Sequence, residues 1–250
     1  GEPDFPTPAP VVEAGQRALA EGRTRYTPAL GIPELRETVA GWYRERFGVA
    51  VSPQRIVITP GSSTGLQMLI AALIDSGERV LLPDPGYPCN RNFVRLAGGE
   101  PVGVPVGPDT GYQLTAELAE AAWSDGVRAL LVASPSNPTG TLLDPGQLAE
   151  LARLAAVRGA RLIVDEIYQG LVYEIEPHTA LALGDQLFVI NSFSKYFGMT
   201  GWRLGWMVAP PEFVEAIDRL AQNIFLAAPT LAQYAALAAF QAPAQAVLEQ

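Results

Sequence analysis

The sequence has few of the residues that most often carry reactive chemistry, with one lysine, one cysteine and one histidine among 250 residues. The single cysteine, Cys89, excludes an internal disulfide and is typical of a reducing compartment, so we expect a cytoplasmic protein. Because Cys89 and His178 lie far apart in the sequence, neither a zinc site nor a catalytic Cys/His pair is well supported. A buried cysteine and a surface histidine are the simpler interpretation.

Further absences narrow the class of protein. No apolar run reaches the length that crosses a membrane. No basic cluster interrupts the net charge of -9, which argues against nucleic acid as a partner. No signal-peptide pattern opens the chain, and its start at Gly1 without a methionine indicates that the natural N-terminus lies upstream. With 48% hydrophobic residues, the chain is globular and not disordered.

The one lysine, Lys195, stands beside sixteen arginines. A lysine amine can lose its proton and attack a carbonyl, whereas an arginine guanidinium stays protonated in proteins. Genome bias that replaced lysine by arginine would also explain the scarcity, and both explanations can hold together. Under either one, Lys195 is the lysine that was retained, which makes it a candidate for chemistry that arginine cannot perform.

Predicted strands and helices alternate along the chain. This alternation indicates βαβ units and a mainly parallel sheet in one large α/β domain. The unbroken apolar run at 128–133 is typical of a strand covered on both faces. Asp144 and Gln147 form a capping-box pattern at one helix start. We expect helices at 10–21, 33–47, 63–75, 88–97, 115–124, 144–158, 211–226 and 230–249, and strands at 55–60, 79–83, 101–105, 128–133, 161–166, 187–193 and 204–210.

Polar motifs follow five of the predicted strands. Ligands of such sheets bind outside the carboxyl ends of the strands, so these motifs are expected to converge at one edge. Any single motif would fit an ordinary turn, but five at one edge indicate a binding site. The motifs are GSST (61–64), DPGY (84–87), SPSNPTG (134–140), DEIY (165–168) and SFSKYFG (192–198).

Two of these features suit an anion. The GSST segment opens a helix, where free N–H groups and the helix dipole attract negative charge, although a simple helix cap is the alternative. Arg203 lies in an apolar stretch and needs an anionic partner. Its planar fork suits a phosphate, and a structural ion pair is the alternative. Ser192 could add a hydroxyl.

The remaining features suit a flat, charged ring. Asp165 ends an apolar strand, where a carboxylate is costly unless it is paired or acts as a helix cap. Tyr168 and Asn137 could both hydrogen-bond one group. Tyr87 could stack on a planar ligand, although an isolated aromatic is more often core. With Lys195 these parts match pyridoxal phosphate (PLP), which needs a Schiff-base lysine and an acidic partner for its ring nitrogen.

Longer motifs carry a family resemblance. The segments GEPDFPTP (1–8), YTPALGIPELR (26–36), SPSNPTG, DEIY and SFSKYFGMTGWRLGW (192–206) resemble class I/II aminotransferases of PLP fold type I. The aspartate aminotransferase-like branch is the most similar, and the likeness runs from Gly1 to about residue 240. It implies a three-layer αβα domain with a mainly parallel central sheet.

The resemblance also implies a role for each matching residue. Lys195 would form the aldimine with PLP, and Asp165 would keep the ring nitrogen protonated. Gly1 would lie near the substrate carboxylate, as would Asn137. Tyr26 would reach the phosphate of the other subunit, which implies a homodimer with shared active sites. Tyr168 and Asn137 would bind the ring hydroxyl, Tyr87 would stack on the ring, and Ser62, Ser63, Ser192 and Arg203 would anchor the phosphate.

The family continues beyond both ends of the 250 residues. By the resemblance, residues 1–15 lead into the large domain, 16–232 form the PLP-binding domain, and 233–250 begin the helix toward a small domain. That small domain would carry the arginine that binds the substrate α-carboxylate. A chain without it would keep the cofactor site and lack a complete substrate site.

The expected function is transfer of an amino group between an amino acid and a 2-oxo acid such as 2-oxoglutarate. Two alternatives remain open. A PLP-dependent C–S lyase would use the same cofactor residues for β-elimination. A non-enzymatic PLP-sensing domain of a transcription regulator would need a DNA-binding module upstream of Gly1, and these 250 residues contain none.

Overall fold

The computed structural model describes residues 2–249 and places seven strands in one sheet, in the order β1-β7-β6-β5-β4-β2-β3. β7 runs antiparallel to both of its neighbours, and the remaining pairs are parallel. The prediction of a mainly parallel sheet is therefore confirmed. The strands are β1 (Ile56–Thr59), β2 (Arg79–Asp84), β3 (Glu100–Pro105), β4 (Val127–Ala133), β5 (Arg161–Asp165), β6 (Phe188–Ser192) and β7 (Gly205–Val208).

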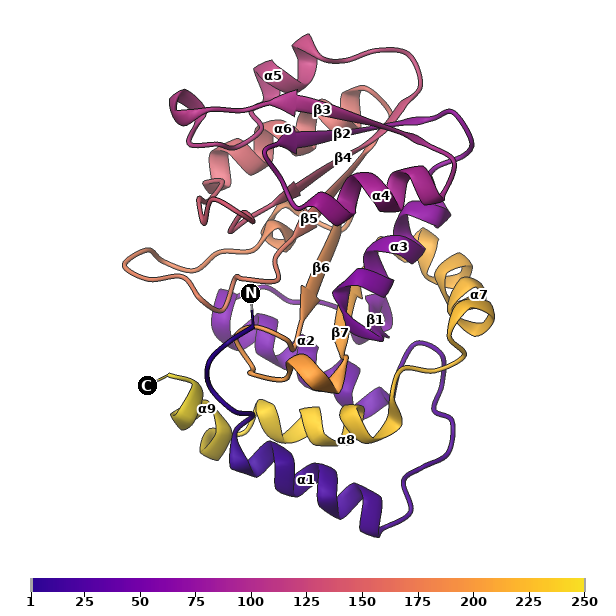
Figure 1. Cartoon of the computed structure of the whole chain (residues 1–250), viewed down its shortest axis with the longest axis vertical. Coiled ribbons are helices and arrows are strands. Elements are labelled where there is room, and N and C mark those ends of the chain that lie inside the picture. Colours follow the sequence, from indigo (N-terminus) through magenta and orange to yellow (C-terminus); the bar gives the residue numbers. More distant parts are fainter. Residues whose placement is uncertain (1, 250) are drawn as a thin grey trace.

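Helices cover both faces of the sheet, as Figure 1 shows, and give the expected three-layer αβα architecture. One face is covered by α3 (Gly61–Leu73), α4 (Pro88–Leu96) and α7 (Val214–Ile224). The other face is covered by α2 (Pro33–Phe47), α5 (Ala116–Ala121), α6 (Pro145–Val157) and α8 (Thr230–Ala239), with α1 (Ala9–Ala20) packed on α8.

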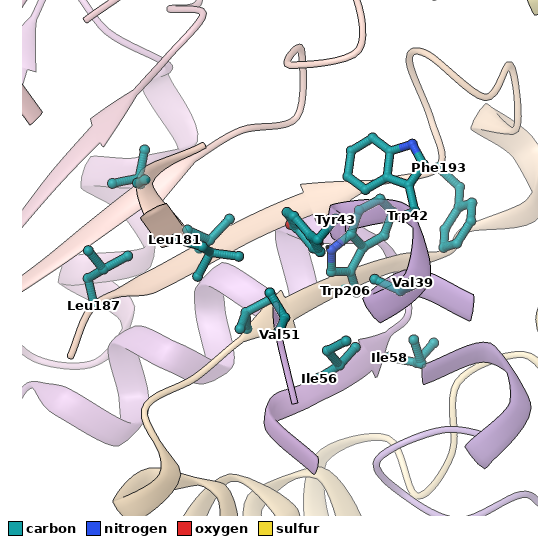
Figure 2. Close-up of a cluster of buried hydrophobic side chains, with 14 of the residues drawn as sticks. Val39, Trp42, Tyr43, Val51, Ile56, Ile58, Leu181, Leu187, Phe193 and Trp206 are labelled. Carbon is teal, nitrogen blue, oxygen red and sulfur yellow. Dashed lines mark hydrogen bonds between the residues drawn. The ribbon is translucent and has the colours of Figure 1, made fainter. Parts of the chain in front are cut away.

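An aromatic cluster fills the core beneath α2 and α8 (Figure 2). Trp206 of β7 is fully buried, and its indole N–H donates to the hydroxyl of Tyr43 at 3.1 Å. Trp42 packs edge-to-face against Trp206, with the ring centroids 5.7 Å apart. Because a buried indole N–H needs an acceptor, this pairing fixes how α2 sits on the sheet.

The largest difference from the sequence prediction lies at the end of the chain. The prediction of a single helix over 230–249 was wrong, because the structure has two helices there, α8 and α9 (Ala242–Leu248). Pro243 lies in the first turn of α9. Proline has no N–H and cannot continue a helix from within, so the helix ends and restarts with proline in a tolerated position.

Smaller features follow the sequence closely. The capping box is confirmed, because the Asp144 carboxylate accepts from the Gln147 N–H and the Gln147 side chain accepts from the Asp144 N–H, both at 2.9 Å. Cys89 and His178 are both half-buried, so the prediction of a buried cysteine and a surface histidine was wrong. Within residues 2–249, no helix combines the length and apolar character that crossing a bilayer requires.

Candidate active site

A cavity of about 320 Å³ opens at the carboxyl ends of the parallel strands. The strand register explains its position. Ala133, Asp165 and Ile190 are neighbours across β4, β5 and β6, so the loops that follow these strands leave the sheet side by side. Eight residues predicted from the sequence line the cavity: Ser62, Ser63, Tyr87, Asn137, Asp165, Tyr168, Lys195 and Arg203.

Asp165 is a buried carboxylate at the bottom of this cavity, with 5% of its surface exposed. Its Oδ1 accepts the N–H of Ile167 at 3.1 Å. No salt bridge among residues 2–249 involves it. Burial raises the pKa of Asp165 to about 6, and the Ile167 hydrogen bond opposes that shift. Within the described part of the chain this carboxylate has no salt-bridge partner, and a protonated ring nitrogen would supply one.

This burial makes a prediction for the cofactor-free protein. The folded pKa of about 6 lies above the unfolded value of about 3.9, so the folded state binds the extra proton between those values. Stability is therefore lost as the pH rises through this window. Asp165→Asn should stabilise the cofactor-free protein by about 3 kcal/mol at pH 8 and by little at pH 4.

Denaturant unfolding of the full-length protein at the two pH values measures this difference. The matched control is Asp125→Asn, at an exposed residue. This control should change stability little, and by the same amount at both pH values. An equal gain at pH 4 and pH 8 for Asp165→Asn would contradict the electrostatic explanation.

Lys195 reaches the cavity from the turn after β6. The turn is closed by the Gly198 N–H, which donates to the Lys195 carbonyl at 3.1 Å. The Lys195 Nζ lies 5.7 Å from the ring centroid of Tyr168. Burial lowers the pKa of Lys195, the nearby Glu2 carboxylate opposes this shift, and the Arg203 guanidinium adds to it. A lowered pKa favours the neutral amine, which is the nucleophilic form.

Another part of the cavity lining suits an anion. α3 begins at Gly61 with no side-chain cap and no acidic residue in its first turn, so its first N–H groups are available to a ligand. Arg203 lies over this helix start, because a Cβ on Gly61 would come within 2.7 Å of its Nη2. Gly205 allows β7 to approach equally closely, since a Cβ there would lie 2.7 Å from the Ser62 nitrogen.

This close packing predicts the effect of Gly61→Ala. The new methyl group would push Arg203 away from the helix start, and the backbone φ of +79° is unfavourable for alanine. We expect a stability loss of about 1–2 kcal/mol from the backbone, together with weaker binding of inorganic phosphate, measured by calorimetry. Gly77→Ala is the control, because Gly77 has φ +82° and no atom near its would-be Cβ. Equal phosphate binding by both variants would contradict the arrangement.

Three further residues, Tyr87, Tyr168 and Asn137, form part of the cavity wall. Tyr87 precedes α4, where a hydrogen bond with the Cys89 thiol, ahead of burial, raises the pKa of its hydroxyl to about 12. Burial, and then the charge of Asp165, raise the pKa of Tyr168. Asn137 lies in the loop between β4 and α6. The walls thus offer two phenol rings and an amide to a planar ligand.

Among residues 2–249, two predicted residues, Ser192 and Tyr26, do not line the cavity. Ser192 is 1% exposed, and its hydroxyl accepts the Ser194 N–H at 3.0 Å and contacts the Leu204 carbonyl oxygen at 3.2 Å. In this position Ser192 shapes the turn that carries Lys195. Tyr26 is 81% exposed on the surface of its own chain. Gly1, predicted near the substrate, lies outside the described residues.

Other cavity residues were not predicted. Glu2 and Thr200 line it, and the Thr200 hydroxyl donates to the Glu2 carboxylate at 2.8 Å. Ser194 lines it beside Lys195, and its place in the SFSK motif was the available signal. Glu166, next to Asp165 and outside the cavity lining, is also buried, and its carboxylate accepts from the Thr179 hydroxyl and the Ala180 N–H. Burial raises the pKa of Glu166 to about 8.

Known proteins are similar to this chain in sequence. The family model for aminotransferase class I and II matches residues 1–250. A valine–pyruvate aminotransferase of Mycobacterium tuberculosis is 44% identical over 248 residues, which cover 98% of this chain and 64% of that protein. A (5-formylfuran-3-yl)methyl phosphate transaminase of Methanocaldococcus jannaschii is 43% identical over 244 residues, or 96% of this chain and 63% of that protein. The chain thus spans slightly less than two thirds of these relatives.

Solved structures share the fold. An aminotransferase from Mycobacterium tuberculosis superposes with a TM-score of 0.95 at 44% identity, over 100% of this chain and 68% of that one. The aspartate aminotransferase of Thermus thermophilus with maleate also gives 0.95, at 38% identity, over 100% and 66%. Together with the family match over residues 1–250, these likenesses show that the chain belongs to the class I and II aminotransferases, a PLP-dependent family of fold type I.

Proposed function

We propose that the protein is a PLP-dependent aminotransferase that moves an amino group between an amino acid and a 2-oxo acid such as 2-oxoglutarate. The observation that carries this proposal is that one cavity holds Lys195, the buried Asp165 and the uncapped start of α3 beside Arg203. The amine, the buried carboxylate and the anion site correspond in turn to the aldehyde, the ring nitrogen and the phosphate of PLP.

When bound, PLP supplies an aldehyde that accepts the amino group and a ring that withdraws electrons from the substrate α-carbon. In our proposal Lys195 Nζ holds the cofactor covalently at rest. When not bonded to the cofactor, the same amine would accept the substrate α-proton as general base and, once protonated, would donate it as general acid. The lowered pKa of Lys195 suits this role, because the amine must be neutral both to attack the aldehyde and to accept the α-proton.

The other residues orient the cofactor and tune its charge. Asp165 keeps a proton on the ring nitrogen, which its buried carboxylate stabilises. Tyr168 and Asn137 bind the ring oxygen, and Tyr87 stacks on the ring. The N–H groups of α3, with Ser62, Ser63 and Arg203, hold the phosphate, and Ser192 supports this site. In this arrangement Ser192 acts through the turn that it shapes.

We extend the proposal to the assembly and the domains. A homodimer is proposed, in which the exposed Tyr26 reaches the phosphate of the partner's site, and Gly1 and Asn137 lie near the substrate. We propose that residues 1–15 lead into a large domain at 16–232, and that 233–250 begin the connection to a small domain. A cytoplasmic location fits the single cysteine.

A donor screen tests the function. The full-length protein with PLP is incubated with single amino acids and 2-oxoglutarate, and glutamate is measured. The proposal predicts glutamate together with the 2-oxo acid of the donor. Pyruvate and ammonia formed without any acceptor would instead indicate β-elimination by a C–S lyase. The absence of turnover with all donors would favour a binding domain.

A further inference from the structure

A buried amide lies behind the loop that carries Asn137. Gln113 precedes α5 and has 1% of its surface exposed. Its Nε2 lies 3.2 Å from the Ala133 carbonyl oxygen and 2.7 Å from the Thr141 carbonyl oxygen. A third contact reaches the Thr141 hydroxyl at 3.3 Å. Since Ala133 and Thr141 flank the loop at 134–140, one amide group connects both ends of it.

The loop has internal hydrogen bonds of its own. The Ser136 N–H donates to the Thr141 carbonyl, and the Gly140 N–H donates to the Ser136 carbonyl, both at 2.8 Å. The Ser134 N–H ties the start of the loop to the Asp165 carbonyl at 3.0 Å. These bonds set the shape of the loop. Among the hydrogen bonds described for residues 2–249, those of Gln113 are the ones that join Ala133 to Thr141 through a single group.

The other end of the same amide indicates why a glutamine is present. Gln113 Oε1 is buried and has no hydrogen-bond partner among residues 2–249. An unsatisfied buried oxygen is unfavourable, and an apolar side chain of similar volume would avoid that cost. The Nε2 donor is therefore the feature of Gln113 that stabilises this region. Its two carbonyl acceptors flank the loop that borders the cavity.

We propose that Gln113 is a positioning residue, which fixes the loop at 134–140 and thereby holds the Asn137 amide in the cavity. The inference rests on the proposed function, in which Asn137 binds the ring oxygen of the cofactor. Gln113 itself does not line the cavity. Its effect on the cofactor therefore passes through the loop.

The test uses Gln113→Met in the full-length holoenzyme. Methionine has a similar length and volume but no donor. Hydrogen exchange of the Ser136 and Gly140 amides should become roughly 10-fold faster. Release of the cofactor should become about 3- to 10-fold faster, as expected when the single hydrogen bond from Asn137 to the cofactor is lost. Val39→Ala, on the buried face of α2, is the control for general destabilisation and should change neither quantity.

A double variant separates this inference from the function on which it rests. If Gln113 acts through Asn137, adding Gln113→Met to Asn137→Ala should not speed cofactor release by more than about 2-fold. Unchanged exchange in Gln113→Met overturns the inference. Additive effects of the two substitutions on cofactor release also overturn it. So does a Gln113→Met variant with faster exchange but unchanged release, if Asn137→Ala does release the cofactor faster. Should Asn137→Ala itself leave release unchanged, the role of Asn137 in the proposed function fails, and exchange alone decides whether Gln113 holds the loop.

Discussion

Replacing Lys195 by alanine should reduce transamination by more than about 10⁴-fold, because covalent attachment of the cofactor and the proton transfer are lost together. The anion site at α3 and Arg203 is untouched by this change, so PLP should still bind, though more weakly. Steady-state assays with an amino donor and 2-oxoglutarate measure turnover, and equilibrium dialysis measures the cofactor.

The matched control is Lys195→Arg, which keeps a positive charge but cannot supply a neutral amine. Equal loss in both variants indicates that the amine chemistry of Lys195 is essential. Substantial turnover in the arginine variant would mean that the charge alone matters, and unchanged turnover in the alanine variant would remove Lys195 from the mechanism.

Asp165→Asn should lower turnover by about 10²- to 10³-fold, the usual cost of removing one pre-organised electrostatic partner. Asparagine can still accept the Ile167 N–H but carries no negative charge for the ring nitrogen. Turnover of the full-length holoenzyme measures the effect. Asp165→Glu keeps the charge and should retain more activity than Asp165→Asn. Equal activity of Asp165→Asn and the unmodified protein would contradict the role of this carboxylate.

The same substitution is expected to stabilise the cofactor-free protein above pH 6, where the carboxylate is charged although it is buried. Loss of function and gain of stability in one variant are characteristic of a residue retained for its chemistry. A purely structural Asp165 would lose stability on replacement at every pH.

The convergence of the site could be predicted because its determinants are local. Apolar runs mark the strands, and parallel strands bring their carboxyl ends to one edge, so Asp165, Lys195 and Asn137 were expected to meet. The lining of the cavity agrees with that expectation. Strand ends set which residues arrive at the edge, and the sequence shows the strand ends directly.

What could not be predicted depends on side-chain direction and on distant contacts. The inward turn of the Ser192 hydroxyl follows from its bond with the Ser194 N–H, which no motif reveals. Gln113 reaches the loop at 134–140 across 20 residues from Ala133 and 28 residues from Thr141. The break between α8 and α9 had a local signal in Pro243, although the apolar pattern continues through it.

The central claim is that Lys195 carries the cofactor, and reductive trapping tests it most directly. Borohydride treatment of the full-length protein with PLP converts a Schiff base into a stable secondary amine, which peptide mass spectrometry can locate. Because these 250 residues contain one lysine, a modified peptide spanning 192–203 identifies the site. We predict a pyridoxyl-phosphate adduct on Lys195. An unmodified Lys195 in protein that retains the cofactor would contradict the account.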